Sequence, residues 1–438
     1  MAFNLKSLLD RDITYSVSNQ VLVSGLNFAI GIIAARALGV SDFGLFSLIL
    51  LMASFTSNIE GQLITLPMMT VAGSRAKRSD SYFSTIMVLG LGFAMISAII
   101  IALFVTILFL LRGQWAEVNL ILASGLIAFS QNVQVTTRRI LFARSKRKQA
   151  VALDLLRLGI MSVFIGYLVT HQSEVDVSLA LYVLAVSALL ATLPFMRLIL
   201  KARVPRRLPL KVLRRHWPMS AWMLLMLLVA IGQEQALWII AGVQFGDEAI
   251  GGLRAGQYLL GTTHFLVYAL ENFMPKTAAQ EMRKDDVSGL VKYLKGQTLF
   301  VGATSLAVII PIAVLAEPLL GLFFGQEFAA YAGHTQIFAM IYAVTIIRMI
   351  WIYYLRVVER TRDVFVSYVI SSALSLAIIF PMISAFGIYG ITLTMLVAQS
   401  VLLIAIGIHI ARHAYVARHD RKNGQPKQLP DLARRELA

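Results

Sequence analysis

Residues 86–111 read IMVLGLGFAMISAIIIALFVTILFLL, and this whole run carries no charged side chain. An α-helix needs roughly 20 apolar residues to cross the hydrocarbon core of a bilayer. A transmembrane β-strand would instead alternate apolar and polar residues over about 10 positions. The run therefore predicts a membrane-spanning helix.

The composition of the whole chain points to the same solvent. Of its 438 residues, 58% are apolar and 14% are charged, and the mean hydropathy is +0.75. Soluble proteins average about 45–50% apolar and about 25% charged residues. These values exclude a soluble multi-domain enzyme and a disordered chain. Cysteine is absent, which removes disulfides and thiolate metal sites.

Working outward from this run gives twelve apolar stretches of sufficient length. The predicted fold class is an all-α polytopic membrane protein with twelve transmembrane helices. The predicted spans are 14–36, 43–68, 80–111, 117–137, 150–170, 177–196, 216–243, 249–275, 293–316, 328–355, 364–386 and 388–411.

Basic residues set the orientation of these spans, because loops rich in Lys and Arg stay in the cytoplasm. With a cytoplasmic N-terminus, most of the 39 Lys and Arg residues fall on the cytoplasmic side, and only Arg36 and Arg112 on the outer side. Both termini are therefore predicted to be cytoplasmic. The basic loops are expected to face anionic membrane lipids rather than nucleic acid. The outer loops are short, and their acidic residues, Asp247 among them, are expected to be solvated.

A short repeat divides the chain into two related halves. Residues 38–44 (LGVSDFG) match residues 245–251 (FGDEAIG) in the spacing of their glycines, and a second match joins Gly113 to Gly325. Residues 38–44 and residues 245–251 each follow the first span of a six-helix half. The two copies therefore have the same topology and form a parallel repeat. The alternative is that these are chance glycine turns between helices.

The repeat and the longest basic loop define the predicted domains. They are an N-terminal lobe at 1–196, a basic cytoplasmic linker at 197–215, a C-terminal lobe at 216–411 and a basic cytoplasmic tail at 412–438. Two six-helix lobes that face each other are the form of an alternating-access transporter. No loop is long enough for a catalytic domain, and the phosphate-binding motif GxxxxGK[ST] is absent. The chain is therefore not expected to be an enzyme.

The predicted eighth span carries polar side chains at helical spacing, which places them on one face. They are Arg254, Gln257, His264, Tyr268 and Glu271. So polar a face lines either a water-filled cavity or a polar contact between helices, because it cannot face lipid. The first two spans carry milder stripes that include Gln20, Asn27 and Asn58. Ordinary hydrogen-bonded packing is the alternative there.

Ionisable residues within the spans cost about 2.5–3.5 kcal/mol each at the bilayer centre, so they must be paired, hydrated or neutral. They are Glu60, Asp154, Arg157, Glu234, Arg254, Glu271 and Arg348, with His264 beside them. Asp154 and Arg157 are three residues apart and are predicted to form a structural pair. The three glutamates are candidates for ion coupling, and pairing with an arginine is the alternative. Because no metal-ligand pattern is present, neither a metal nor a cofactor is predicted.

Four segments resemble the polysaccharide-biosynthesis flippases, the O-antigen and capsule repeat-unit translocases of the multidrug/oligosaccharidyl-lipid/polysaccharide exporter superfamily. Residues 35–46 (ARALGVSDFGLF) are similar to the family's ARxLGxxxFGxF segment. Glu234 followed by residues 250–258 (IGGLRAGQY) resembles its acidic residue and vGxYxaA pattern. Residues 322–328 (LFFGQEF) resemble its lfGeeF turn, and residues 356–362 its charged loop after the tenth span.

The resemblance implies a flippase that moves undecaprenyl-diphosphate-linked oligosaccharide from the inner to the outer leaflet of the bacterial cytoplasmic membrane. Its product would serve exopolysaccharide, O-antigen or capsule biosynthesis. The implied partners are the lipid-linked oligosaccharide, membrane lipids, and a polysaccharide polymerase or glycosyltransferases. By matching position, the resemblance assigns the diphosphate to Arg254 first and to Arg348 second. The polar side chains expected to line the cavity are Gln257, His264, Tyr268, Asn27, Gln20 and Asn58.

Two departures from relatives qualify this assignment. The peptidoglycan-precursor relatives have two more spans and basic residues within their first two helices, whereas here Arg36 lies at the outer end of the first span. That difference favours the oligosaccharide branch. Within the predicted spans, however, carboxylates outnumber arginines, which weakens the case for a cationic cavity. The alternatives are a multidrug or organic-cation antiporter of the same superfamily and a non-transporting membrane scaffold of polysaccharide assembly.

Overall fold

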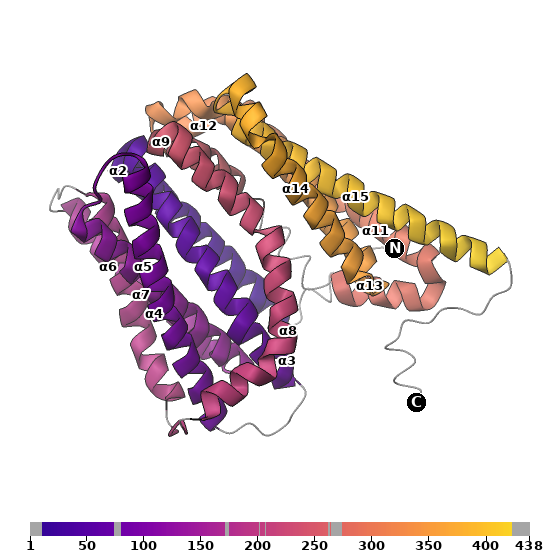
Figure 1. Cartoon of the computed structure of the whole chain (residues 1–438), viewed down its shortest axis with the longest axis horizontal. Coiled ribbons are helices and arrows are strands. Elements are labelled where there is room, and N and C mark those ends of the chain that lie inside the picture. The colour runs from indigo at the N-terminus through magenta and orange to yellow at the C-terminus, as the bar shows by residue number, and fades with distance from the viewer. Residues whose placement is uncertain are drawn as a thin grey trace. The chain divides into compact units, whose positions relative to one another are not determined.

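The computed structural model describes residues 11–73, 80–170, 175–200, 202–205, 207–261, 263 and 274–422. Every regular element in these residues is a helix (Figure 1). The first helices are α2 (Arg11–Glu60), the π-helix η1 (Gly61–Thr65), α3 (Leu66–Gly73), α4 (Asp80–Leu111), α5 (Val118–Ala143), α6 (Arg147–Thr170) and α7 (Val177–Ile199). They are followed by α8 (Leu208–Ala230), α9 (Gly232–Gly261), α11 (Met274–Val314), α12 (Ala316–Phe323), the 3₁₀-helix η2 (Gln326–Tyr331), α13 (Ala332–Val357), α14 (Thr361–Phe386) and α15 (Tyr389–Lys422).

Helix α4 shows why the bilayer is the solvent. One face of it buries Ala94, Ile101, Val105 and Leu108 against the protein. Its other face leaves Ile99, Leu103, Ile107 and Leu111 more than half exposed. A helix that is apolar all round is typical of a membrane span, because water would not tolerate so continuous an apolar face.

The structure agrees with the predicted twelve-helix architecture once its bent helices are divided. Within the described residues, nine helices are long and apolar enough to cross a membrane, or ten when α8 and α9 count as one bent span. One of the nine is Phe28–Met69, whose 42 residues would extend about 63 Å at 1.5 Å per residue, enough for two spans. The predicted eighth span begins in α9 and continues into residues 264–273, outside the described part.

Contacts divide the chain into two compact units, Ile33–Arg254 and Met1–Ile32 with Ala255–Ala438. These units differ from the two lobes predicted on either side of residues 197–215. The difference arises because α8, which begins at Leu208 within that linker, packs on η1, α3 and α4 and so joins the unit Ile33–Arg254. The six-and-six lobe boundary stays a prediction.

Inside the unit Ile33–Arg254, α5 packs on α4 and α7, and α6 packs on α7 (Figure 1). A buried apolar cluster joins η1, α3, α4 and α5 through Ile64, Met68, Met87, Val133 and Ile140. The ends of α2, η1, α5 and α8 are thereby fixed relative to one another.

In the other unit, α13 packs on α11 and α15, and α14 packs along α15 (Figure 1). α14 ends at Phe386, and the next residue, Gly387, has a φ of 58° that a side chain would resist. α15 begins two residues later, at Tyr389, so these helices are joined by a tight turn.

Candidate functional site

The two glycine segments matched in the sequence adopt the same backbone conformation. Gly39 has φ 73° and ψ 174°, and Gly246, its counterpart in the repeat, has φ 78° and ψ −173°. Both interrupt a long helix at a positive φ, which only glycine adopts readily. The second matched pair, Gly113 and Gly325, also has positive φ, at 72° and 132°. All four matched glycines therefore adopt a conformation that favours glycine, and the duplication itself stays a prediction.

The first two turns also pack reciprocally on each other. A Cβ added to Gly44 would lie 1.8 Å from the carbonyl oxygen of Asp247, and one added to Gly251 would lie 1.9 Å from that of Val40. Residues 44 and 251 correspond in the repeat, and so do residues 40 and 247. The contact thus has the local two-fold symmetry that a duplicated segment produces, and the missing side chains of the glycines make it possible.

An ion pair closes this contact from a third element. Arg112, directly after α4, binds both carboxylate oxygens of Asp247, at 2.7 and 2.8 Å, and donates to the carbonyl oxygen of Gly242 at 2.8 Å. Such a bidentate arrangement is the strongest arginine–carboxylate geometry. The side chains of Arg112 and Asp247 are only 14% and 15% exposed. The expectation that Asp247 is solvated is therefore wrong, because the turn contact shields it and Arg112 compensates its charge. We call Gly44, Gly251, Arg112 and Asp247 the turn clamp.

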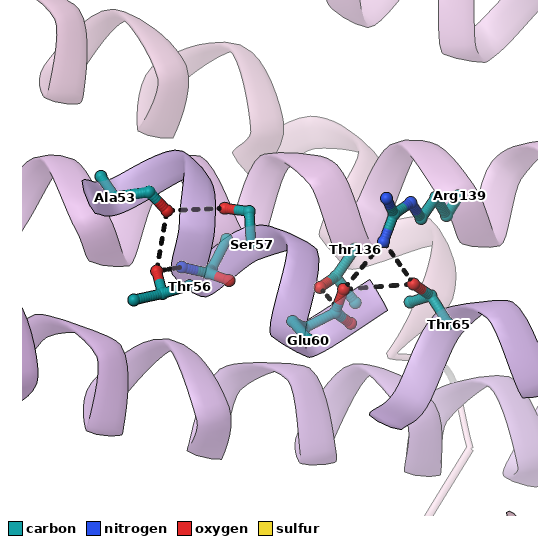
Figure 2. A network of polar contacts seen from close by, with 8 residues as sticks. Ala53, Thr56, Ser57, Glu60, Thr65, Thr136 and Arg139 are labelled. Atoms are coloured by element: carbon teal, nitrogen blue, oxygen red, sulfur yellow. Dashed lines mark hydrogen bonds and ion pairs between the residues drawn. The ribbon is translucent and has the colours of Figure 1, made fainter. Parts of the chain in front are cut away.

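A second polar network lies where α2 passes into the π-helix η1 (Figure 2). Glu60 is completely buried. Its Oε1 accepts from Thr136 at 3.1 Å, and its Oε2 accepts from Thr65 at 3.1 Å and from Nη1 of Arg139 at 3.2 Å. Nη1 of Arg139 also donates to the Thr65 hydroxyl at 2.7 Å. We call these four residues the Glu60 network.

The π-turn explains how this network assembles. In η1 the N–H of Leu66 bonds to the carbonyl of Gly61, five residues earlier. The extra residue in the turn brings Thr65 beneath Glu60, where an α-helix would place residue 64. A Cβ at Gly61 would lie 2.6 Å from Nη1 of Arg139, so glycine also leaves room for the guanidinium. The local sequence therefore fits the ion pair at two points.

The other polar residues of the predicted second span contact α5. Gln131 donates to Ser54 at 2.9 Å, and Asn132 donates to Thr56 at 3.1 Å. Together with Thr136 and Arg139 they form a row of hydrogen bonds along the α2–α5 contact. Asn58 is partly buried on the same helix. The contact from Gln131 favours the packing alternative for Ser54.

Helix α8 packs directly against the π-turn. The Ser220 hydroxyl donates to the carbonyl oxygen of Leu63 at 3.1 Å. Next to it, the Tyr82 hydroxyl of α4 lies 3.2 Å from Nε2 of His216. The helix that packs on η1, next to the Glu60 network, thus begins within the basic segment 197–215.

Arg254, the first candidate for binding a phosphate, is held by an aromatic ring. Its guanidinium lies 5.4 Å from the ring centroid of Trp238, which is completely buried. Both residues belong to α9, on either side of the Gly246 turn. Glu234 is partly buried in the first turn of the same helix. The cation–π contact orients Arg254 without neutralising it.

Arg348, the second candidate, is buried in α13 with 8% of its surface exposed. Its Nη1 donates to the Tyr368 hydroxyl of α14 at 2.8 Å, and its guanidinium lies 5.9 Å from that ring. Gln257 is partly buried, and its backbone carbonyl accepts from Tyr342 of α13 at 3.5 Å. Arg254 belongs to the unit Ile33–Arg254, and Arg348 and Gln257 belong to the other unit.

Asp154 and Arg157 each have a partner on α5. Oδ2 of Asp154 lies 3.0 Å from Nε of Arg138, and Nη1 of Arg157 donates to Gln134 at 2.7 Å. The negative charge of Asp154 also attracts the guanidinium of Arg157. The pairing predicted between Asp154 and Arg157 themselves stays a prediction, within a larger cluster that ties α6 to α5.

Solved structures show which proteins share this architecture. The structure titled lipid II flippase MurJ, in its inward closed conformation, aligns with a TM-score of 0.71 over 91% of this chain and 87% of that one, at 13% identity. An inward-facing multidrug resistance MATE family transporter of the MOP superfamily aligns at 0.64, with 16% identity over 91% of this chain and 94% of that one. The eukaryotic MATE transporter AtDTX14 aligns at 0.63, with 14% identity over 91% and 94%.

The chain shares the fold of these solved structures. No protein-family model and no curated protein matches its sequence. The same fold occurs in proteins titled as a lipid flippase and as multidrug transporters, so the fold alone does not choose between these activities.

Part of the predicted site lies outside the described residues. His264, Tyr268 and Glu271 fall in the part of the chain that the structure does not describe. Gln20 and Asn27 lie within α2, but their side chains are also outside the described part. In the described part of the chain, no group of three His, Asp or Glu residues is arranged to hold a metal ion.

Sequence reasoning missed Arg138 and Arg139 as site residues. It ended the fourth span at residue 137 and placed both arginines in a basic loop, whereas α5 continues to Ala143. The sequence contains a signal for this extension. Thr136 and Arg139 are three residues apart, so they lie on one helical face, and buried Glu60 needs a partner.

Proposed function

We propose that the chain is an alternating-access flippase that moves undecaprenyl-diphosphate-linked oligosaccharide across the bacterial cytoplasmic membrane. The lipid-linked oligosaccharide is moved from the inner to the outer leaflet, where it is used for exopolysaccharide, O-antigen or capsule biosynthesis. Arg254 is our first candidate for binding the diphosphate and Arg348 the second, and the membrane potential or an ion gradient drives the cycle. The MOP fold supports a transporter, and the rest of the proposal depends on the charges within the spans.

One observation favours an anionic substrate over a cationic one. Because α5 extends to Ala143, Arg138 and Arg139 join the arginines carried on the spanning helices. The carboxylates Glu60 and Asp154 already lie against these two arginines. A drug cation would have to displace an arginine from either carboxylate. Once Arg138 and Arg139 are counted, arginines outnumber carboxylates on the spanning helices. This excess suits a diphosphate, whose oxygens match the guanidinium fork.

The turn clamp supports alternating access. It joins Asp247 and Gly251, which precede Arg254 on α9, to Gly44 on α2 and to Arg112 after α4. On the orientation predicted from the basic loops, this contact lies on the outer side. It closes that side when made and opens it when broken.

The test is transport of a lipid-diphosphate oligosaccharide in proteoliposomes. Wild type is compared with Arg254→Ala, Arg254→Lys and Glu234→Gln. Arg356→Ala is the matched control, because Arg356 also lies over an aromatic ring, that of Tyr353, but at the end of α13. We expect flipping by wild type and the control, loss in Arg254→Ala, and partial activity in Arg254→Lys because lysine keeps the charge but not the fork.

The alternatives predict different results. A multidrug or organic-cation antiporter, favoured by the fold match to MATE transporters, would give ion-linked efflux of organic cations and no flipping by folded wild type. A scaffold would show neither activity, and Arg254→Ala would disrupt assembly with its partners. Loss of only the gradient-driven component in Glu234→Gln would assign ion coupling to that carboxylate.

The partners of this flippase are defined by its substrate. The enzyme that completes the lipid-linked oligosaccharide supplies it on the inner leaflet, and a polysaccharide polymerase or glycosyltransferase consumes it afterwards. We propose these partners on the chemistry of the substrate alone. Co-purification of such enzymes with the wild-type chain tests them.

A further inference from the structure

The Glu60 network has more polar structure than helix packing needs. A buried ion pair is seldom more stable than apolar packing of the same volume. Here the pair is also supported by two threonine hydroxyls, a π-turn and a glycine that leaves room for the guanidinium. π-turns inside α-helices occur frequently at functional sites. The arrangement therefore indicates that the Glu60–Arg139 pair has a function beyond helix packing.

The two charges of the pair differ in accessibility. The side chain of Glu60 has no exposed surface, whereas that of Arg139 is 27% exposed. A ligand that approaches from the exposed side meets the guanidinium and not the carboxylate. Such a ligand must accept hydrogen bonds, because a guanidinium only donates them, and the positive charge favours an anionic acceptor.

The position of Arg139 suits a phosphate of a lipid headgroup. Arg139 lies four residues before the last residue of α5, about 6 Å along the axis at 1.5 Å per residue. The basic segment Arg144–Lys148 follows at once. On the predicted orientation this end of α5 is cytoplasmic, so the guanidinium lies near the headgroup level of the inner leaflet.

An anion on Arg139 would leave the Glu60 carboxylate buried and without a cation. That state is strongly unfavourable, and a proton on Glu60 removes the charge. The protonated carboxyl can still accept from Thr65 and Thr136, which hold it in place. Release of Arg139 and protonation of Glu60 are therefore linked.

We propose that the Glu60–Arg139 pair is a proton-linked loading site for the diphosphate of a polyprenyl lipid on the inner leaflet. A cytoplasmic proton binds Glu60 as the phosphate oxygens replace the carboxylate at Arg139. When the phosphate moves on, Arg139 returns to Glu60 and the proton returns to the cytoplasm. This inference rests on the proposed flippase function and adds a site separate from Arg254 and Arg348.

Within the described part of the chain, Arg139 is the charged side chain that forms an ion pair with Glu60. The positive charge of Arg138, also on α5, repels that of Arg139. Helix α3 carries no titratable residue. Tyr82 of α4 and His216 of α8 hydrogen-bond to each other beside the π-turn. The first turns of α8 also carry Lys211, Arg214 and Arg215.

The experiment measures binding to the full chain in nanodiscs as pH is lowered from about 8 to about 6. The probes are undecaprenyl diphosphate, inorganic diphosphate and undecaprenol. One linked proton strengthens binding by up to about tenfold per pH unit. We expect this gain for undecaprenyl diphosphate on wild type, relative to Glu60→Gln, which imitates the protonated carboxyl and binds tightly throughout. Arg139→Gln should weaken binding at every pH, and Arg138→Gln should keep the wild-type pH dependence.

A second pair of variants keeps the test decisive if Glu60→Gln does not fold. Thr136→Val removes a donor to Glu60, so the gain in binding should begin at a higher pH. Thr137→Val is the matched control, because its hydroxyl bonds to Val133 and Met87 rather than to Glu60. Thermal unfolding checks the integrity of each variant.

The outcomes separate this inference from the proposed function. Inorganic diphosphate bound with the same pH dependence supports the site and assigns recognition to phosphate alone. Equal binding of undecaprenol, or unchanged pH dependence in both Glu60→Gln and Thr136→Val, overturns the loading site. If wild type still flips the lipid-linked oligosaccharide, the proposed function stands without it. If wild type exports organic cations and binds no diphosphate, both fail.

Discussion

Two of the arginine–carboxylate pairs in the unit Ile33–Arg254 have opposite designs. Arg112 and Asp247 meet through two parallel hydrogen bonds at the end of α4, and the pair joins segments 135 residues apart. Arg139 and Glu60 meet through one guanidinium nitrogen, and two threonines complete the carboxylate's hydrogen bonding. α4 and α5 are adjacent and antiparallel (Figure 1). The pairs therefore lie roughly 30 Å apart, at opposite ends of the helices.

The two arginines differ in how readily each could exchange its carboxylate for another ligand. Both Nη atoms of Arg112 are engaged by one carboxylate and a carbonyl, which suits a clamp that is either closed or open. Arg139 makes a less complete ion pair, and more of its side chain is exposed, which suits exchange of one anion for another. Two pairs of the same chemistry can therefore be assigned to conformational closure and to ligand loading.

The largest effect should come from breaking the turn clamp at its glycines. Gly44→Ala and Gly251→Ala each place a Cβ within 2 Å of a backbone oxygen that cannot move as a side chain can. We expect a loss of more than about 3 kcal/mol of stability, beyond ordinary overpacking, together with loss of transport.

Gly92→Ala is the control for this effect. Gly92 lies within α4, and a Cβ there meets nothing within 4 Å. It should be neutral or stabilising by up to about 1 kcal/mol. Thermal unfolding in detergent and proteoliposome transport measure both quantities. Equal stability in Gly44→Ala and Gly92→Ala would refute the reciprocal packing.

The next effect tests the asymmetry of the buried pair. Arg139→Gln leaves the fully buried Glu60 without its cation and should cost about 3–5 kcal/mol. Glu60→Gln leaves Arg139, which is partly exposed and can be hydrated, so it should cost less. In the double variant the two losses should fail to add by more than about 1 kcal/mol. Thermal unfolding of the four proteins checks this, and additive losses would show that the pair is not coupled.

The sequence predicted the glycine spacing of the turn clamp, whereas it did not predict the Glu60 network. The spacing recurs at Gly39 and Gly44 and at Gly246 and Gly251, and the first glycine of each pair has a positive φ. The long apolar runs likewise predicted the twelve-helix fold, because a span depends on local composition alone.

The partner of each charge could not be predicted in this way. Asp247 was expected in water, and Arg139 in a loop, because composition does not show which segments pack on them. Arg112 finds Asp247 only once the repeat brings distant turns together. The π-turn at Gly61 has no composition signal, and without it Thr65 would not reach Glu60.

A smaller effect should follow from opening the turn clamp at its ion pair. Arg112→Gln removes the charge that faces Asp247 and should cost about 1–2 kcal/mol, since hydrogen bonds to charged groups have this size. Arg112→Lys should recover part of it. The chain has no cysteine, so Ala249→Cys, buried at the turn, provides a single labelling site.

Membrane-impermeant maleimide added outside measures the opening. Labelling of Ala249→Cys should be faster with Arg112→Gln than with Arg112 intact, and high salt should add little, because most of the pair is shielded. If labelling is unchanged while Gly44→Ala increases it, the glycine contact closes the turns without help from the ion pair.

The smallest effect should come from Trp238, which orients a charge without pairing it. Trp238→Phe keeps an aromatic face beneath Arg254 but weakens the cation–π attraction, by about 0.5–1 kcal/mol, so flipping should fall by a few-fold. Trp238→Leu should reduce flipping further while Arg254→Ala abolishes it. Because Trp238 is completely buried, thermal unfolding must accompany the transport measurement. If Trp238→Phe lowers stability and transport in proportion to Trp238→Leu, the ring acts by packing, and Arg254 is positioned by other contacts.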